Sequence, residues 1–291
     1  MSSDDAGQVD ESTQWERVDG TWLRVLRFAP GPAVRGADGP GVAASPRPGF
    51  AVVLPGLGLP RYLLPLARHL ASQGLETLVL DALAWRGRGP RATATIAGLS
   101  ELAASWLERQ EDGPVVVVGH STGAQVALET VLRAQRTRPS LALVMGGPTF
   151  TPDQRRLRWL VPAALTAYLK DPFWELVVLK DVARVRTDLA RIVQSGRRHP
   201  TDKRVGLLTV PLTVTAGEAD TFAPRDWLDL LARRAGASSR AVVLPGSHNN
   251  PFPHPELFGA LVLEALDAAL GEACKETIEG AVATEDARDL S

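Results

Sequence analysis

Short apolar runs alternate with amphipathic segments along most of the 291-residue chain. Almost wholly apolar runs are typical of strands buried on both faces of a parallel sheet, and the amphipathic segments between them are typical of covering helices. The predicted strands are 50–54, 75–80, 115–118, 141–145, 212–215 and 241–244, and the predicted helices are 62–72, 96–109, 121–133, 224–234 and 255–270. The pattern predicts an α/β fold, with a mostly parallel central sheet and helices on both faces.

A β-hairpin is predicted before this alternation begins. Apolar and polar residues alternate over 14–18 and 21–28, on either side of Asp19-Gly20. An Asp-Gly pair between two such segments is a strong hairpin signal. The polar, acidic residues 1–13 are expected to form a flexible N-terminus, and residues 30–49, of which half are Gly or Pro, an exposed loop.

The strand–helix rhythm stops between residues 148 and 205. This stretch has no clear strand, and it holds twelve Lys and Arg against six Asp and Glu. We interpret 148–205 as a helical cap or lid inserted between a first part of the core, 14–147, and a second part, 206–270. Residues 271–291, with six acids and two bases, are expected to form a flexible acidic tail.

The composition narrows the class of protein. Hydrophobic residues make up 45% and charged residues 22% of the chain, which is ordinary globular usage. A formal charge of −1 argues against a nucleic-acid binder. No apolar run is long enough to span a membrane, and the N-terminus lacks the pattern of a secretory signal. The single cysteine, Cys274, cannot form an internal disulfide, and it excludes thiol-rich zinc sites. We therefore expect a cytoplasmic protein without a bound metal.

The sequence Gly119-His120-Ser121-Thr122-Gly123 lies between a predicted strand and a predicted helix. A sharp strand-to-helix turn exposes a serine in a strained backbone conformation, and flanking glycines let the strand and helix approach closely. The pattern predicts Ser121 as a nucleophile. The alternative is that Gly119 and Gly123 only shape a tight turn.

A serine nucleophile needs a base to take its proton. His248 follows the last predicted strand, so its loop reaches the carboxyl edge of the sheet, where the serine turn also lies. We predict His248 as this base, with a surface-loop histidine as the alternative. His120 adjoins the serine, but its side chain is expected to point away from it.

The base needs an acid that orients it, and Asp220 follows the strand 212–215. The chain order Ser121, Asp220, His248 is the nucleophile–acid–base order expected for this architecture. An acid in this place is more often a turn former or a helix cap. Glu218 and Asp153 stay open as substitutes.

An oxyanion hole needs fixed donors beside the serine. The backbone N–H of Thr122, the residue after the nucleophile, is one candidate. The loop Pro55-Gly56-Leu57-Gly58 follows the first central strand and provides another. Pro55 has no N–H, so Leu57 is the predicted second donor, unless the loop is a simple glycine-rich turn.

From about residue 15 to 270 the chain resembles the α/β-hydrolase fold superfamily. The resemblance is carried by Gly119–Gly123, by Gly217-Glu218-Ala219-Asp220 with Pro224, and by Pro245-Gly246-Ser247-His248. It implies a serine hydrolase that cleaves a carboxylic ester or related acyl bond of a small molecule through an acyl-enzyme, without a cofactor. The same catalytic triad would also serve an acyltransferase, thioesterase or perhydrolase, and a ligand-binding module that has lost turnover is a further alternative.

Two departures from the family pattern concern the pocket. The family often has His-Gly where this chain has Pro55-Gly56, which affects the oxyanion turn. The loop after the second central strand lacks the usual Gly-x-Gly-x-Ser ending and instead contains Trp85, Arg86 and Arg88. We predict these three residues as a possible substrate rim that recruits an anionic substrate. The alternative is a set of solvated loop side chains.

Overall fold

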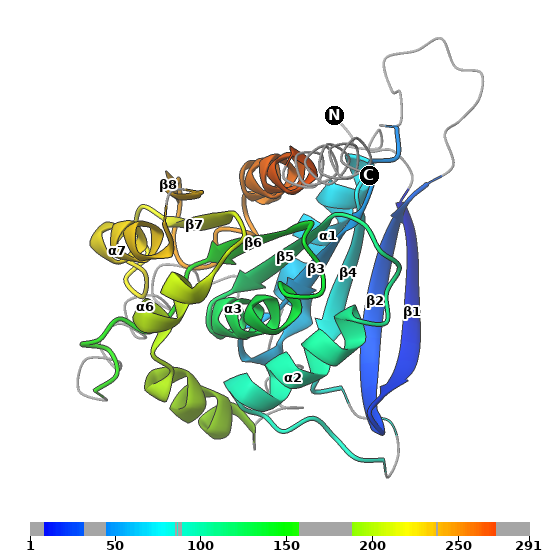
Figure 1. Ribbon diagram of the computed structural model, residues 1–291, viewed down its shortest axis with the longest axis horizontal. Helices are drawn as coiled ribbons and strands as arrows, with labels where there is room; N and C mark the ends of the chain where they lie inside the picture. The colour runs from blue at the N-terminus through cyan, green and yellow to red at the C-terminus, as the bar shows by residue number, and fades with distance from the viewer. Residues whose placement is uncertain are drawn as a thin grey trace, which may run out of the picture.

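An eight-stranded sheet forms the centre of the molecule (Figure 1). The computed structural model describes residues 9–31, 45–84, 86, 89–156, 188–236 and 238–271. The strands are β1 Val9–Val18, β2 Thr21–Pro30, β3 Phe50–Leu54, β4 Glu76–Asp81, β5 Val115–His120, β6 Leu141–Gly146, β7 Leu212–Gly217 and β8 Ser239–Leu244. Their order is β1-β2-β4-β3-β5-β6-β7-β8. The pairings from β4 through β8 are parallel, whereas β1 pairs with β2 and β2 with β4 in the antiparallel sense.

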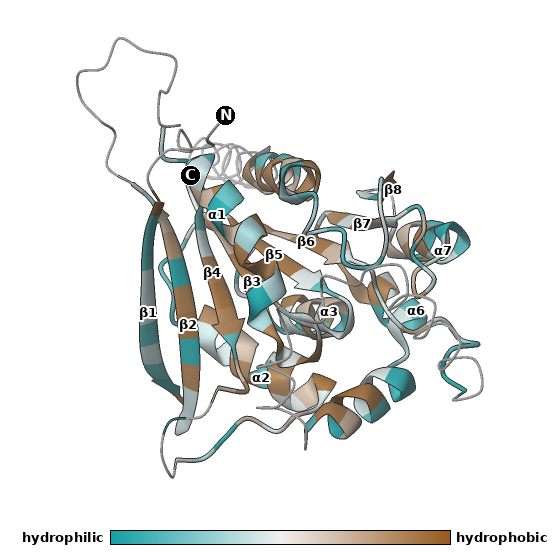
Figure 2. Cartoon of the chain, turned by 180° about the vertical axis from the view of Figure 1, so that it is seen from behind, coloured by the Kyte–Doolittle hydropathy of each residue, from teal (hydrophilic) through white to brown (hydrophobic). Residues whose placement is uncertain are grey.

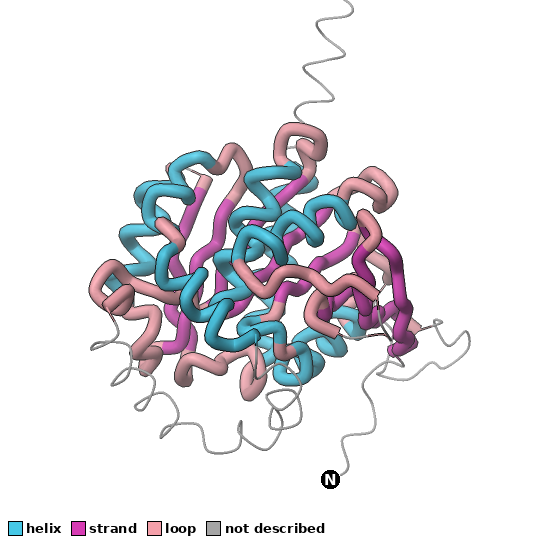
Figure 3. Tube along the Cα trace, turned by 90° about the horizontal axis from the view of Figure 1, so that it is seen from below, coloured by secondary structure: helices cyan, strands magenta, loops and turns pink. Residues whose placement is uncertain are grey.

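Helices cover both faces of this sheet (Figures 1 and 3). The α-helices are α1 Leu64–Ser72, α2 Ile96–Leu107, α3 Thr122–Ala134, α6 Thr201–Arg204 and α7 Arg225–Ala235; the 3-10 helices are η1 Gly56–Gly58, η2 Pro60–Leu63 and η3 Val205–Leu207. Residues 188–198 and 255–271 are also helical. Helices α2 and α3 pack against each other, and the segment 255–271 packs on α1, where Gly259 lies close to the His69 ring. The predicted α/β fold class is confirmed.

The central strands explain why their sequences are apolar. Every residue of β5, β6 and β7 is buried, so each strand faces helices on both sides. Figure 2 shows these strands mainly in the hydrophobic colour and α7 mainly in the hydrophilic one. Strand β5 ends at His120, two residues beyond the predicted end at Val118, because Gly119 and His120 still pair with β6. The polar ring of His120 is buried there with hydrogen-bond partners inside the protein.

The predicted hairpin is present, but its first strand is longer than predicted. Asp19 and Gly20 have φ values of 47° and 81°, as a two-residue turn of the primed type requires. Strand β1 begins at Val9, so residues 9–13, expected to be flexible, pair with β2 instead. Most β1 side chains are exposed and polar. The added residues 9–13 are held mainly by backbone pairing with β2 and therefore give little hydrophobic signal.

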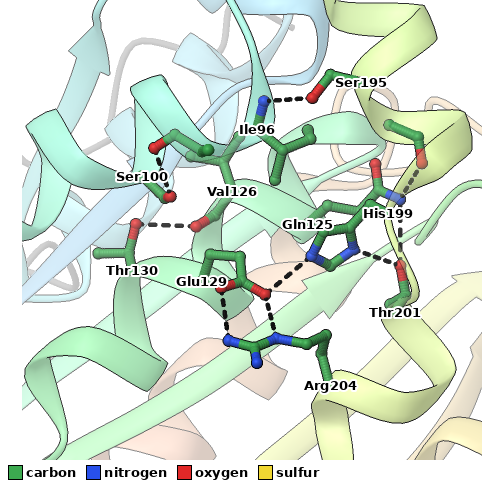
Figure 4. A network of polar contacts seen from close by, with 12 residues as sticks. Ile96, Ser100, Gln125, Val126, Glu129, Thr130, Ser195, His199, Thr201 and Arg204 are labelled. Carbon is green, nitrogen blue, oxygen red and sulfur yellow. Dashed lines mark hydrogen bonds and ion pairs between the residues drawn. The ribbon is translucent and has the colours of Figure 1, made fainter.

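The predicted lid, 148–205, lies largely outside the described residues, as does the predicted tail from 272 onward. The described helical segment 188–198 of the predicted lid is attached to the core by polar contacts (Figure 4). The Ser195 hydroxyl accepts the Ile96 N–H at 2.9 Å, and Asp188 pairs with Arg91 at 2.9 Å. Among the described helices, none has the length and apolar character needed to cross a membrane.

Candidate active site

Ser121 forms the whole connection between β5 and α3. Its φ of 58° and ψ of −126° lie in a region that side chains disfavour. The backbone holds this conformation partly through the Ser121 N–H, which donates to the Gly146 carbonyl at 2.8 Å. A Cβ atom on Gly119 would lie 2.3 Å from the Gly123 carbonyl oxygen, and one on Gly123 would lie 2.1 Å from that of Leu54. Both glycines are therefore required by close backbone approach.

The structure brings the three predicted triad residues together from separate loops. His248, after β8, has Nε2 at 3.1 Å from Oγ of Ser121. Its Nδ1 lies 2.9 Å from Oδ2 of Asp220, which follows β7. His248 and Asp220 are buried, whereas Ser121 is half-buried. A chain of hydrogen bonds thus runs from a partly accessible hydroxyl through an imidazole to a buried carboxylate.

The Asp220 carboxylate is held in its ionised form. Burial raises the pKa of Asp220, but attraction to His248, the hydrogen bond from His248 and the bonds from the Phe222 and Ala223 amides outweigh it. The net effect is a pKa below the usual range. The two amides donate to Oδ1 at 2.8 and 3.2 Å, which leaves Oδ2 for the imidazole. The alternatives Glu218 and Asp153 are exposed.

The His248 ring is confined on two further sides. The Phe222 ring lies against it with a centroid separation of 4.8 Å. Gly147 has a φ of 50°, and a Cβ atom there would lie 3.0 Å from both Cε1 and Nδ1 of His248. The ring is therefore packed between an aromatic side chain and a glycine backbone that leaves room for it.

The predicted oxyanion residues lie beside the serine, but they also contact each other. Leu57 has a φ of 54°, and its N–H donates to Oγ1 of Thr122 at 2.8 Å. A Cβ atom on Gly56 would lie 2.8 Å from the Ser121 Cβ, so this loop lies against the predicted nucleophile. Thr122 is the first residue of α3, where helix amides lack intrahelical acceptors.

The predicted substrate rim is described only in part. Trp85 and Arg88 lie outside the described residues. The exposed Arg86 stacks on the hairpin, with its guanidinium carbon 4.9 Å from the Trp22 ring and 5.6 Å from the Trp15 ring. This cation–π packing gives Arg86 a structural role in attaching the loop to β1 and β2.

Sequence reasoning gave no role to Tyr62 or His120. His120 does point away from the serine, as expected: Nδ1 lies 2.9 Å from the Tyr62 hydroxyl, and Nε2 lies 2.8 Å from the His248 carbonyl oxygen. Burial, aided by the nearby His248, lowers the pKa of His120 to about 3. The available signal was a histidine at the end of an otherwise apolar strand.

Within the described ranges, no group of three or more His, Cys, Asp or Glu side chains is placed to share a metal ion. The polar groups of the candidate site are the hydroxyl, imidazole and carboxylate of the predicted triad and the nearby backbone amides. Such a set can activate an oxygen nucleophile and stabilise negative charge on a substrate oxygen.

The sequence and the fold both have relatives of known class. The family model described as the alpha/beta hydrolase family matches residues 51–261. Lipase LipV of Mycobacterium tuberculosis is 46% identical over 104 residues, 35% of this chain and 38% of the lipase. The pimeloyl-[acyl-carrier protein] methyl ester esterase of Neisseria meningitidis is 28% identical over 210 residues, 62% of this chain and 66% of the esterase. A hydrolase structure from Pseudomonas aeruginosa PA01 shares the fold, with a TM-score of 0.63 and 20% identity over 88% of this chain and 98% of that one.

Proposed function

Because the chain belongs to the alpha/beta hydrolase family, we propose that it is a serine hydrolase that cleaves a carboxylic ester or a related acyl bond. The observation that carries the proposal is the continuous contact from Ser121 Oγ through His248 to Asp220, at 3.1 and 2.9 Å. These are the distances over which a positioned base takes a proton from a nucleophile. The substrate is a small acyl compound, and the chemistry needs no cofactor.

The proposed reaction has two stages. In the first, Ser121 Oγ attacks the acyl carbonyl carbon while His248 Nε2 takes the hydroxyl proton, and the same proton then passes to the departing alkoxide, which leaves as the alcohol. In the second, water attacks the acyl-enzyme and gives its proton to His248, which returns a proton to Ser121 as the carboxylic acid is released. Asp220 stays ionised and stabilises the imidazolium formed in each stage.

The tetrahedral intermediates carry negative charge on the former carbonyl oxygen. We assign its stabilisation to the backbone amides of Thr122 and Leu57, where one such donor is worth on the order of 3 kcal/mol in comparable enzymes. The Leu57 amide already donates to Oγ1 of Thr122. The substrate oxyanion would share or take over that donor. The N-terminus of α3 adds a partial positive charge in the same place.

The relatives support an acyl ester as the substrate class. One is named a lipase and the other a methyl ester esterase, and both names specify cleavage of a carboxylic ester. The match covers 38% of the first protein and 66% of the second, so their own substrates do not carry over as a whole. The ester bond is what we bring to this chain.

The test is covalent labelling combined with turnover. A fluorophosphonate should label the wild-type protein at Ser121, and Ser121→Ala should abolish both labelling and hydrolysis of chromogenic esters. Ser72→Ala, which removes a hydroxyl bonded to the His69 carbonyl in α1, is the control and should keep both. Normal ester turnover by Ser121→Ala would overturn the proposal.

The substrate panel should vary the acyl chain length, the charge and the bond type. A preference for anionic esters would support the predicted rim of Trp85, Arg86 and Arg88, since positive side chains attract anions. Including acyl-thioesters and amine or peroxide acceptors separates ester hydrolysis from thioesterase, acyltransferase and perhydrolase activity. Tight binding without turnover across the panel would indicate a ligand-binding module.

A further inference from the structure

We propose that Tyr62 and His120 form a positioning relay that fixes the catalytic serine, the loop of the catalytic histidine and the oxyanion loop relative to one another. The inference rests on the proposed function, since it concerns how that same triad is held. Both residues act through others: their contacts run to backbone groups of Gly56 and His248, and they are positioning residues.

The relay consists of three hydrogen bonds inside the protein. The Gly56 N–H donates to the Tyr62 hydroxyl oxygen at 2.8 Å. The Tyr62 hydroxyl lies 2.9 Å from Nδ1 of His120, and Nε2 of His120 lies 2.8 Å from the His248 carbonyl oxygen. Tyr62 is 1% and His120 2% exposed, so these bonds form away from solvent. The relay therefore links the loops that follow β3 and β8 to the last residue of β5.

The chemistry of its two ends fixes the direction of every bond. A backbone amide only donates and a carbonyl only accepts. Nε2 of His120 must therefore carry the hydrogen that faces His248. The neutral ring then presents the Nδ1 lone pair, which accepts the Tyr62 O–H. Burial favours this neutral form, because it lowers the pKa of His120 to about 3 and raises that of Tyr62.

Each end of the relay lies next to a reacting group. His120 directly precedes Ser121, so its side chain joins the backbone of the nucleophile to the backbone of His248. The His120 and His248 rings also pack against each other in a tilted arrangement, with their centroids 5.0 Å apart. At the other end, Gly56 lies against the Ser121 Cβ and precedes the proposed donor Leu57.

As a consequence, the backbones of Ser121 and His248 are held relative to each other by contacts on two sides of the site. The 3.1 Å separation of Ser121 Oγ and His248 Nε2 depends on how their backbones are spaced, and the relay sets that spacing from the opposite side. A misplacement of about 1 Å in such a site costs on the order of 100-fold in rate. Removing the relay should therefore slow the chemical step while the substrate pocket keeps its affinity.

The experiment uses matched variants of the full-length protein. Tyr62→Phe removes one hydroxyl, and His120→Phe keeps a buried ring but removes both nitrogens. His120→Gln is the conservative rescue, because its amide offers an acceptor for Tyr62 and an N–H donor for His248. Active-site concentration is measured by fluorophosphonate titration, so that misfolded protein does not lower the apparent kcat.

We expect Tyr62→Phe and His120→Phe each to lower kcat per active site by about 10- to 100-fold with KM changed less than about threefold. His120→Gln should recover most of the activity lost in His120→Phe. The double variant Tyr62→Phe/His120→Phe should lose little more than the worse single variant, since members of one network are not additive. The rate of fluorophosphonate labelling should follow the same order.

Two results would overturn the relay. One is a kcat per active site within twofold of wild type in both single Phe variants. The other is an equal loss in His120→Gln and His120→Phe, which would assign the effect to packing alone. Failure of the proposed function gives a different result, because Ser121→Ala would then keep turnover. A relay failure leaves the Ser121 dependence intact.

Discussion

The carboxylate of Asp220 lies 2.9 Å from Nδ1 of His248 and accepts two backbone amides on its other oxygen. The two amides fix the orientation of the carboxylate, so that its other oxygen points at the imidazole. The imidazole is thereby held with a protonated Nδ1 toward Asp220 and the Nε2 lone pair toward Ser121 Oγ, which is the orientation that the proposed proton transfer requires.

Replacement of Asp220 by Asn should lower kcat by about 10³- to 10⁴-fold. The amide removes the negative charge that stabilises the imidazolium and can present its NH₂ group to Nδ1, which favours the wrong tautomer. Steady-state kinetics with a chromogenic ester measure the loss. Glu218→Gln and Asp153→Asn are the controls for the two alternative acids, and both should retain wild-type kcat. Full activity in Asp220→Asn would exclude this carboxylate from the triad.

Gly147→Ala should lower kcat strongly while lowering the free energy of unfolding only modestly. The new Cβ would lie 3.0 Å from two atoms of the His248 ring and 3.2 Å from Oδ2 of Asp220, so these groups must give way and the position of the ring relative to Ser121 changes. We expect a 10- to 100-fold fall in kcat, with a backbone cost of about 1–2 kcal/mol from the φ of 50°. Gly20→Ala is the control: it carries a similar backbone cost at φ 81° but has open space around it, and it should keep kcat.

The Glu129 cluster should make stability depend on pH in the acid range. Glu129 of α3 accepts hydrogen bonds from His199 at 2.9 Å and from Arg204 at 2.7 and 2.8 Å (Figure 4). Burial raises the pKa of Glu129, but the opposite effect of these partners is larger, so the pKa falls from 4.5 to about 2. Because the folded pKa lies below the unfolded one, the stabilisation is complete above about pH 4.5 and is lost as the pH falls toward 2.

Urea unfolding at pH 6 and pH 3 checks this prediction. Other acids also titrate in this window, among them Asp202, whose pKa is lowered by Arg155 and Arg234 against the effect of burial. The informative quantity is thus the difference between proteins. Glu129→Gln should be less stable than wild type at pH 6 and should lose less stability between the two pH values. An identical loss in both proteins would contradict the assignment.

Arg138→Met should destabilise the fold without changing catalysis. The buried guanidinium donates to the carbonyls of Leu107 at 2.7 Å, Gln110 at 3.1 Å and Glu111, at the end of α2. Methionine removes all three bonds: the Leu107 carbonyl keeps only the Gln110 N–H, and the carbonyls of Gln110 and Glu111 lose this donor. We expect the free energy of unfolding to fall by about 2–4 kcal/mol. Arg109→Met, which breaks an exposed pair with Asp19, is the matched control and should cost less than about 1 kcal/mol.

The sequence was sufficient to predict the elements and the candidate site residues that have a local signal or follow from the topology of the sheet. The valines of β5 are apolar because both faces of the strand are covered, so their run predicts a buried strand directly. The glycines around Ser121 are required by the close approach of β3, β5 and α3, which ties that motif to one geometry. The placement of Asp220 and His248 followed from a topological rule, since loops at the carboxyl edge of a parallel sheet converge.

The features that were missed depend on contacts between distant segments. Tyr62 reads as an ordinary apolar position at the start of a helix, and only the packed fold brings its hydroxyl to His120. Residues 9–13 have no hydrophobic alternation, because their strand is stabilised by the backbone of β2 and by pairs such as Glu11 with Arg68. The loop around Arg86 has the composition of a solvated loop. The stacking of Arg86 on Trp22 could be predicted only once the position of the hairpin was known.

The positive φ of Ser121 places backbone strain at the residue that we propose as the nucleophile. A side chain in this conformation costs about 1–3 kcal/mol, which glycine would not incur, although glycine gains more freedom in the unfolded chain. Ser121→Gly should therefore have a free energy of unfolding about 1 kcal/mol higher than that of wild type. It should unfold at a higher urea concentration and be inactive. The chain would thus be more stable without the hydroxyl that we propose as its nucleophile, which is the exchange of stability for activity that a strained active site entails.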